Sequence, residues 1–238
     1  FLSGGVDSST IVALMSQQMD QPVLTHCVGF NFQNIDERKY AAQISKLVGT
    51  DHRDDVIDLD VGEKLDDIIW HMDEPFADAS AIPTYYLCEA ARKRVTVCLS
   101  GDGGDELFAG YNRYLWTDQL WRKQSGIPLL VRSALSRLME VVPVESWNYM
   151  YGHVAKLFGS TYRQNNVGLK IQKLSQLLRC TTENEAYRHL ISYWQENFLP
   201  LIGADSIDFD LFDSSPNELK SLVDKGMYWD QLTYLPGD

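Results

Sequence analysis

The sequence predicts an α/β fold in which a doubly wound parallel sheet is followed by a helical subdomain. Segments rich in β-forming residues alternate with helical segments up to about residue 110, as they do in parallel sheets covered by helices. After Leu107 the β signal fades and helical periodicity continues. A chain of 238 residues accommodates one α/β domain with a helical appendage. We expect the α/β core within residues 1–114 and the helical subdomain within residues 115–238.

Periodicity and the residues that end each segment define the elements of the first half. Val23–Phe30 is rich in β-forming residues and follows a stretch with apolar residues at helical spacing. Pro83 suits the first turn of a helix, and Val95–Leu99 has the composition of a buried strand. In order, the sequence predicts a helix over 7–19, a strand over 23–30, a helix over 36–48, a strand over 52–59, helices over 63–71 and 83–94, and a strand over 95–99.

The second half is expected to be entirely helical. Helical stretches are predicted within 111–139, 147–158, 169–178 and 184–198, with an acidic loop over 206–216. The opening Phe1-Leu2 is shorter than an ordinary strand of about five or six residues, so we expect a severed strand in a piece of a longer protein. The helical subdomain is likewise expected to be truncated at its C-terminus.

Composition narrows the class of protein. The chain has 21 Lys and Arg against 33 Asp and Glu, a formal net charge of −12, which argues against a nonspecific nucleic-acid binder with a basic face. No apolar run approaches the roughly 18 residues of a membrane span, and the start lacks a signal-peptide pattern. The four cysteines show no C-x-x-C pairing. We therefore expect free, mostly buried thiols and a cytoplasmic protein.

The first segment that carries chemistry is Ser3-Gly4-Gly5-Val6-Asp7-Ser8-Ser9, between the short opening strand and a helix start. Its glycines let backbone N–H groups close on an anion, its serines add hydroxyl donors, and the helix N-terminus adds about half a positive charge. Asp7 would repel a polyphosphate unless a divalent cation bridges the two, so it predicts Mg²⁺. The alternative is a loop whose Ser or Asp only caps the helix. A Walker A loop is excluded because no G-K-[ST] follows.

A second segment, Ser100-Gly101-Asp102-Gly103-Gly104-Asp105-Glu106, follows the predicted strand over 95–99. The carboxyl end of a parallel strand is where doubly wound folds bind ligands. If the strands that precede the two segments are neighbours, Asp7 and Asp105 can hold one cation while Asp102 faces the reacting group. The alternative is a solvated acidic turn with a capping carboxylate.

Both segments resemble those of a known family. The opening loop resembles the S-G-G-x-D-S-S pyrophosphate loop of N-type ATP pyrophosphatases. Ser100 to Tyr111 resembles S-G-[ED]-G-[SG]-D-E-x-F-x-G-Y, which narrows the resemblance to the synthetase domain of glutamine-hydrolysing asparagine synthetases and their relatives. The resemblance implies an adenine nucleotide alpha hydrolase-like fold. It continues at Asp36-Glu37, Tyr40-Ala41, Leu47 to His52, Asp73-Glu74-Pro75, and Tyr234 to Asp238, which resembles the point just before the family's Lys-x-Asp-Arg segment.

The resemblance implies roles for individual residues. Asp7 and Asp105 match the Mg²⁺ ligands, and Asp102 matches an acidic residue near the acyl-adenylate that is commonly glutamate in asparagine synthetases. The side chain of Asp102 is one methylene shorter than that glutamate. Carboxylates other than aspartate therefore remain alternative substrates. The remaining matched positions hold ATP: Leu2, Val28 (through its backbone), Ser100 and Gly101 at the adenosine, and Ser3, Gly4, Gly5, Asp7, Ser8 and Ser9 at the pyrophosphate.

The implied reaction is ATP-dependent amide formation. A carboxylate, with aspartate as the first expectation, attacks the α-phosphorus, Mg-pyrophosphate leaves, and ammonia attacks the acyl-adenylate. The ammonia would come from a glutaminase domain that this chain does not contain, and the family's catalytic lysine would follow Asp238, so we expect impaired activity. Three alternatives stay open: an amidotransferase acting on a sugar acid or peptide, another N-type ATP pyrophosphatase, or a non-catalytic nucleotide-binding module.

Two further groups of residues carry weaker signals. Glu74, Asp78 and Ser80 precede a helix where the family's site is lined, although Glu74 is equally typical of a turn before Pro75. The five histidines are scattered without metal-ligand spacing, so we assign none of them to catalysis.

Overall fold

A computed structural model of the chain describes residues 1–30, 36–57, 61–73, 78, 80–158, 166–192, 210–212, 216 and 218–237. It divides into two compact units, Phe1–Gly110 together with Gln231–Asp238, and Tyr111–Asp230. The end of the chain thus belongs with the first unit, whereas we expected it in the helical subdomain. Hydrogen bonds explain this placement, because Gln231 Nε2 donates to the carbonyl of Glu106 at 3.2 Å and the hydroxyl of Tyr234 donates to Asp78 Oδ2 at 2.7 Å.

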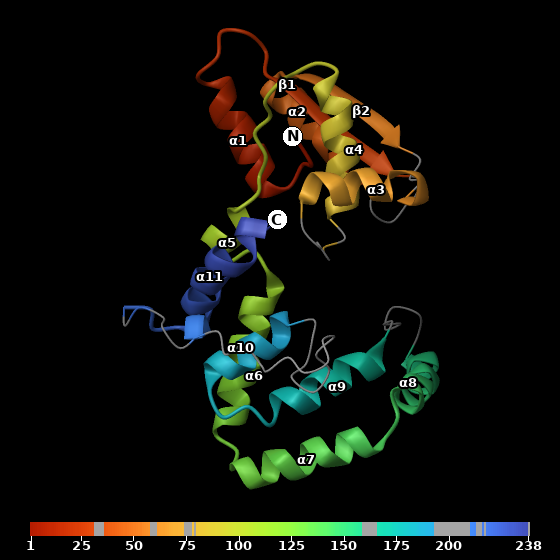
Figure 1. The fold of residues 1–238 in the computed structure, drawn as a ribbon, viewed down its shortest axis with the longest axis vertical. Coiled ribbons are helices and arrows are strands. Elements are labelled where there is room, and N and C mark those ends of the chain that lie inside the picture. Colours follow the sequence, from red (N-terminus) through yellow and green to blue (C-terminus); the bar gives the residue numbers. More distant parts are fainter. Residues whose placement is uncertain are drawn as a thin grey trace. The chain divides into compact units, whose positions relative to one another are not determined.

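The first unit contains the α/β part of the chain (Figure 1). Its elements are α1 (Val6–Ser16), β1 (Leu24–Phe30), α2 (Arg38–Val48), β2 (Asp51–Ile57), α3 (Val61–Met72), α4 (Ala81–Arg92), α5 (Gly104–Phe108) and the 3-10 turn η3 (Leu235–Gly237). The helices and strands predicted between residues 7 and 94 are confirmed, with ends that differ by up to three residues.

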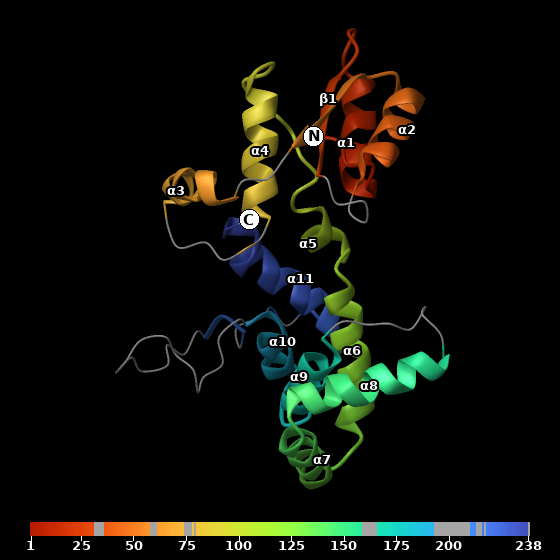
Figure 2. The same cartoon turned by 90° about the vertical axis from the view of Figure 1, so that its right-hand side faces the viewer.

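β1 and β2 form a parallel pair whose register runs from Leu24 opposite Asp51 to Phe30 opposite Ile57. Helices α1 and α2 lie on one face of β1 and α4 lies on the other (Figure 2). This arrangement is α/β with a parallel sheet, as predicted. The described residues contain two paired strands, so the larger doubly wound sheet stays a prediction.

The prediction of a strand over Val95–Leu99 is wrong. The segment has no regular secondary structure, and Val97 and Leu99 are exposed. A strand needs a ladder of hydrogen bonds to a neighbour. Among the described residues, Phe1 and Leu2 lie between this segment and β1: the Phe1 amino group donates to the carbonyl of Leu99 at 2.6 Å, and the N–H of Leu2 donates to the carbonyl of His26 at 3.0 Å.

The core of the first unit joins the opening residues to the sheet and its helices. Leu2, Val12 of α1, Cys27 of β1 and Ala41 of α2 are buried together, with Ile44 packed against them. The backbone after Leu2 therefore enters the loop over 3–9 from a buried position.

The second unit is helical, as predicted. Its elements are α6 (Asn112–Ser125), α7 (Leu129–Val141), α8 (Val144–Phe158), α9 (Val167–Leu177), α10 (Glu183–Ile191), the 3-10 turn η2 (Asp210–Phe212) and most of α11 (Leu222–Thr233). The stretch predicted over 111–139 is two helices, because Gly126 and Pro128 end α6 before α7 begins. Residues 193–198 of the last predicted helix, and most of the predicted acidic loop, lie outside the described residues.

Aromatic rings and one ion pair occupy the interior of the second unit. Tyr114, Tyr187 and Trp229 are fully buried, and the rings of Tyr114 and Tyr187 stack with centroids 6.2 Å apart. Asp230 is also fully buried and accepts hydrogen bonds from Arg113 Nη2 at 2.6 Å and from the Tyr114 hydroxyl at 2.7 Å. This interior connects α6, α10 and α11 within the unit.

The four cysteines are all free, as predicted. Cys27 and Cys180 are buried, whereas Cys88 and Cys98 are exposed, so the expectation of mostly buried thiols holds for half of them. Cys98 is exposed because the segment around it is not a buried strand. No helix among the described residues is long and apolar enough to cross a membrane.

Candidate functional site

The opening loop folds back on the first turn of α1. The Oγ atoms of Ser3 and Ser8 lie 3.0 Å apart, and the N–H of Gly5 donates to Ser3 Oγ at 3.1 Å. Gly4 has a φ of 85°, in the left-handed region that favours glycine. A β-carbon at Gly4 would also stand 2.5 Å from Cβ of Tyr40. The loop therefore requires glycine at this position both for its backbone and for its packing on α2.

The N-terminus of α1 is not capped by a side chain. Gly5 is the N-cap residue and makes no side-chain cap hydrogen bond to the first turn of α1, although Ser3 Oγ accepts from the N–H of Gly5 itself. The choice between an anion-binding loop and a loop that only caps the helix stays a prediction. The Oγ of Ser9 is buried and has no hydrogen-bond partner among the described residues. Helix N–H groups and a free hydroxyl are the donors that phosphate oxygens require.

The two glycine-rich segments meet, although residues 10–99 separate them in the sequence. A β-carbon at Gly101 would stand 2.9 Å from the backbone nitrogen of Ser8, and one at Gly104 would stand 2.5 Å from Cγ of Asp7. Both distances are shorter than real β-carbon contacts. The second segment thus approaches the helix N-terminus backbone-first, and the carboxyl group of Asp7 lies against it.

The acidic residues of the second segment occupy different positions. Asp102 is exposed, and its Oδ2 accepts a hydrogen bond from Ser100 Oγ at 2.6 Å. The carboxyl group of Asp105 lies beside Gly110, where a β-carbon would overlap with Oδ1 of Asp105. The structure therefore places Asp7 beside the segment that carries Asp105. That the two carboxylates share one cation stays a prediction.

Leu2 and Val28 lie at the same edge of β1. The N–H of Leu2 donates a hydrogen bond to the carbonyl of His26. This carbonyl is on the edge of β1 that faces away from β2. Backbone polar groups of residues two apart in a strand point to the same edge, so Val28 presents its N–H and carbonyl there as well. This places the backbone of Val28 beside the entry to the loop over 3–9, and its contact with adenosine stays a prediction.

Two features of the site were not predicted. The side chain of Leu235 lies 3.7 Å from the β-carbon position of Gly103, which has a φ of 82°. The segment that resembles the point just before the family's Lys-x-Asp-Arg segment therefore packs on the second loop, a contact that no local pattern signals. Asp78 receives hydrogen bonds from the Tyr234 hydroxyl and from the N–H of Ser80 at 2.8 Å, whereas Glu74 lies outside the described residues.

All charged side chains of the two segments are acidic. Neither 3–9 nor 100–106 contains Lys or Arg, while together they contain Asp7, Asp102, Asp105 and Glu106. A bound polyphosphate would receive backbone N–H and hydroxyl donors here but no side-chain positive charge. The donor set therefore fits a nucleotide that carries a divalent cation, which oxygen ligands of this kind hold.

Comparison with known proteins identifies the family. The sequence model of the asparagine synthase family matches residues 1–238. The chain belongs to the asparagine synthase family. This family membership confirms the resemblance that the two loops carry.

Alignments with curated members of the family cover part of the chain. Asparagine synthetase [glutamine-hydrolyzing] 1 of Bacillus subtilis is 43% identical over 115 residues, which are 48% of this chain and 18% of that protein. Putative asparagine synthetase [glutamine-hydrolyzing] 2 of Methanocaldococcus jannaschii is 45% identical over 117 residues, 48% of this chain and 22% of that protein. The putative asparagine synthetase [glutamine-hydrolyzing] of Mycobacterium bovis is 34% identical over 144 residues, which are 60% of this chain and 22% of that protein. The matches thus span about a fifth of these relatives. No solved structure matches significantly.

Proposed function

We propose that this chain is the synthetase part of an ATP-dependent amide-forming ligase, in which the loop over 3–9 and the segment over 100–106 bind ATP. The observation that carries the proposal is the contact of Asp7 with Gly104. It brings a phosphate-binding sequence and an acidic sequence to one place at a helix N-terminus. The three relatives described above are named asparagine synthetases, which supports the reaction class.

The phosphates of ATP are assigned to the uncapped first turn of α1. Backbone N–H groups at a helix N-terminus can bind an anion, and the Oγ of Ser9 supplies a donor that no described residue uses. Asp7 and Asp105 are the residues that would hold Mg²⁺, which supplies the positive charge that the loops lack. Leu2, Ser100, Gly101 and the backbone of Val28 would hold the adenosine.

The reaction follows from an ATP held in this way. A carboxylate oxygen of the substrate forms a bond to the α-phosphorus and pyrophosphate leaves. Ammonia then attacks the acyl carbon, and AMP leaves as the amide forms. Fixing the nucleotide in the loop orients the α-phosphorus for in-line attack, which is the main contribution a protein makes to such a step. Asp102, exposed beside Ser100, is the residue that we assign to orient the ammonia and to accept its proton.

The substrate is proposed to be aspartate, with ammonia delivered by the glutaminase part that the names of the relatives indicate. A different carboxylate is favoured by one observation, the short arm of Asp102, which leaves more room than a glutamate would. Pyrophosphate release in the presence of free ammonia, compared among aspartate, a sugar acid and a peptide carboxylate, distinguishes these substrates.

Calorimetry with ATP and Mg²⁺ tests the assigned site. We expect binding to the 238-residue chain, and a loss of about 10-fold or more in affinity on Asp7→Asn, which keeps the shape of the side chain and removes its charge. Asp20→Asn is the matched control because Asp20 is exposed and follows α1 at its other end. Equal affinities of Asp7→Asn and the unchanged chain at saturating Mg²⁺ would overturn the cation role of Asp7.

A further inference from the structure

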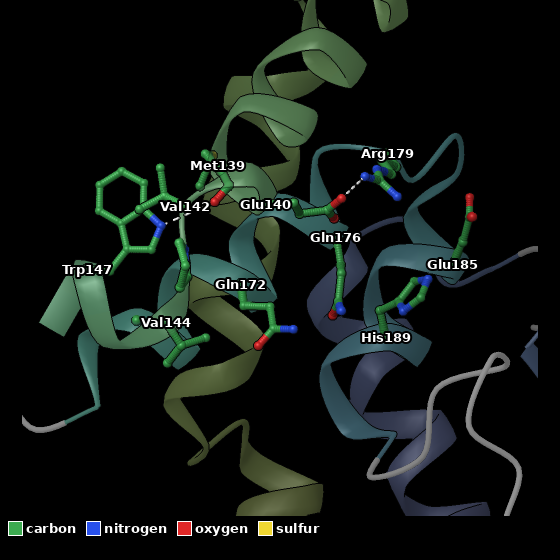
Figure 3. Close-up of a pocket in the computed structure, with 12 residues that line it drawn as sticks. Met139, Glu140, Val142, Val144, Trp147, Gln172, Gln176, Arg179, Glu185 and His189 are labelled. Atoms are coloured by element: carbon green, nitrogen blue, oxygen red, sulfur yellow. Dashed lines mark hydrogen bonds and ion pairs between the residues drawn. The ribbon is translucent and has the colours of Figure 1, made fainter.

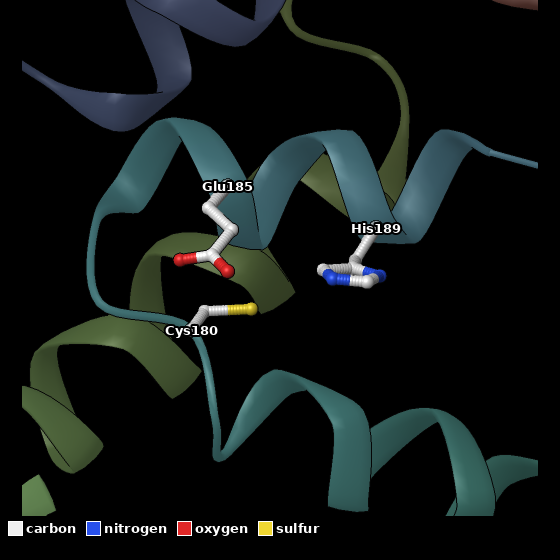
Figure 4. Close-up of side chains that lie close together, drawn as sticks. All are labelled: Cys180, Glu185 and His189. Carbon is white, nitrogen blue, oxygen red and sulfur yellow. The ribbon is translucent and has the colours of Figure 1, made fainter. Parts of the chain in front are cut away.

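Three side chains of the second unit that can bind a metal ion converge at the start of α10. One ligand atom from each of Cys180, Glu185 and His189 lies within 4.8 Å of those of the other two. The sulfur of Cys180 points between the carboxylate of Glu185 and the imidazole ring of His189 (Figure 4). A thiol, a carboxylate and an imidazole are different ligand types, so this group is not a simple acidic cluster.

The local sequence explains how the three side chains come together. Thr182 caps α10, its side chain accepting a hydrogen bond from the N–H of Glu185 at 3.2 Å. Glu185 and His189 are four residues apart on this helix, so their side chains lie on one face. Cys180 lies in the turn between α9 and α10, buried against Leu177 and Ala186. The turn therefore brings the thiol under the face that carries the other two ligands.

Each of the three groups retains ligand capacity. Glu185 Oε2 accepts hydrogen bonds from Thr181 N–H at 2.7 Å and Thr181 Oγ1 at 3.1 Å, but no described residue donates to its Oε1. Within the described part of the chain, neither ring nitrogen of His189 makes a hydrogen bond. Among the described residues, the one hydrogen bond of Cys180 Sγ is a weak one, donated to the carbonyl of Gln176 at 3.6 Å.

A cavity of about 560 Å³ adjoins two of the three side chains (Figure 3). Glu185 and His189 line it, together with Gln176, Arg179 and Glu140. The Arg179 guanidinium is paired with the Glu140 carboxylate, so its charge is compensated within the cavity wall. An ion held by the three ligands would therefore have access to water or a small ligand from the cavity side.

We propose that Cys180, Glu185 and His189 bind a Zn²⁺ ion through three protein ligands and leave its fourth coordination position open toward this cavity. Thiolate, imidazole and carboxylate are the ligands that zinc takes in proteins, and sites with three protein ligands keep a position for water or a substrate. Mg²⁺ and Ca²⁺ take oxygen ligands and do not match a set in which sulfur and nitrogen are two of three. The site is separate from the proposed ATP site, since all its residues belong to the second unit.

The competing interpretation is purely structural. Glu185 would be only the partner of Thr181 and Thr182 at the helix start, and Cys180 only a core residue. Burial raises the pKa of the Cys180 thiol to about 12, so without a cation the thiol stays protonated. A zinc ion would displace that proton, because the thiolate is the form that binds metal. The two interpretations therefore differ in whether added metal produces a thiolate ligand at Cys180.

Titration of the 238-residue chain with Co²⁺ and then Zn²⁺ distinguishes them. Co²⁺ is a spectroscopic substitute for Zn²⁺, and a thiolate ligand gives it a sulfur-to-metal charge-transfer band. We expect this band to saturate at one Co²⁺ per chain and to disappear as Zn²⁺ displaces the Co²⁺. Oxygen-ligand sites, such as the acidic loops of the first unit, do not give a band of this kind.

Variants assign the band to the three side chains. Cys180→Ser should abolish it, and His189→Gln should weaken zinc binding by about 100-fold or more, beyond the 10- to 100-fold typical of residues outside the first coordination sphere. Glu185→Gln preserves a helix cap, because Gln serves as well as Glu in a capping box, yet it removes the charged ligand and should also weaken binding. Cys27→Ala is the matched control, since Cys27 is the other buried thiol, and it should leave the band unchanged.

Two results would overturn the proposal. One is the absence of any charge-transfer band in a chain whose circular dichroism shows it to be folded. The other is a band or a zinc affinity that stays the same in Glu185→Gln and His189→Gln. Circular dichroism of every variant without metal separates loss of ligands from loss of folding.

Discussion

Gly104 leaves the space that the carboxyl group of Asp7 occupies: a β-carbon on Gly104 would stand 2.5 Å from Cγ of Asp7 and 2.9 Å from its Oδ1. The contact joins the first turn of α1 to the first turn of α5 within one unit. Because backbone rather than a side chain faces Asp7, the carboxylate can approach the second segment without displacing it.

Gly104→Ala is therefore expected to displace Asp7. Forcing a methyl group into a packed site typically costs about 1–3 kcal/mol, and about 1.4 kcal/mol corresponds to a tenfold change in affinity. We expect calorimetry to show an affinity for Mg-ATP that falls by about 10-fold or more. Gly126→Ala is the control, since a β-carbon at Gly126 meets no atom within 4 Å. Unchanged ATP binding in Gly104→Ala would show that the position of Asp7 is unimportant for the nucleotide.

The buried ion pair of the second unit is expected to be a main determinant of its stability. Asp230 is fully buried, and its Oδ2 accepts from Nε and Nη2 of Arg113 at 3.1 and 2.6 Å. Arg113→Met leaves this carboxylate without its cation, which typically costs about 3–5 kcal/mol. Urea unfolding measures the change as a lower midpoint.

An exposed ion pair supplies the comparison for Arg113→Met. Arg122 pairs with Asp118 one turn away on α6, and the Arg122 side chain is 70% exposed. Arg122→Met should cost less than about 1 kcal/mol, because solvent screens such pairs. If the two variants lose equal stability, burial of Asp230 is not what makes its pair important.

His52 is expected to make the first unit less stable in acid. Burial lowers the pKa of His52, whose Nδ1 lies 3.0 Å from Thr25 Oγ1. Below the usual histidine pKa of about 6.5, the unfolded chain therefore binds more protons at this residue than the folded chain does. This contribution to stability is present above that pH and is lost as the pH falls through it. Thermal unfolding between about pH 7 and pH 5 should show a smaller loss of stability in His52→Gln than in the unchanged chain. Parallel profiles would contradict the role of His52.

The four thiols are expected to react in two classes. Cys88 and Cys98 are exposed, whereas Cys27 is 6% and Cys180 is 1% exposed. Burial raises the pKa of Cys27 to about 11, and that of Cys180 to about 12, so their reactive thiolate forms are scarce. In the presence of a chelator, two thiols should react quickly with a thiol reagent and two only after unfolding. Four equal rates would show that the buried pair is accessible.

Local sequence pattern was sufficient for most elements and for the loop chemistry. The β-forming run at 23–30 and the helical spacing at 36–48 predicted β1 and α2, because such patterns depend on neighbouring residues alone. The glycines and serines of 3–9 predicted a loop leading into a helix, and Gly4 has the positive φ that this requires. The family, too, was recognisable from the residues of the two loops.

Contacts between distant residues were decided by the tertiary structure. Val95–Leu99 has the composition of a strand, yet it is not one, because a strand also needs a neighbour with which to form hydrogen bonds. The approach of Gly104 to Asp7 depends on where the sheet and helices place the two loops. Cys180, Glu185 and His189 have no recognised metal-ligand spacing, and they converge only because the turn before α10 folds the thiol under that helix. Sequence spacing determines which face of one helix or strand a residue occupies, whereas packing determines which faces meet.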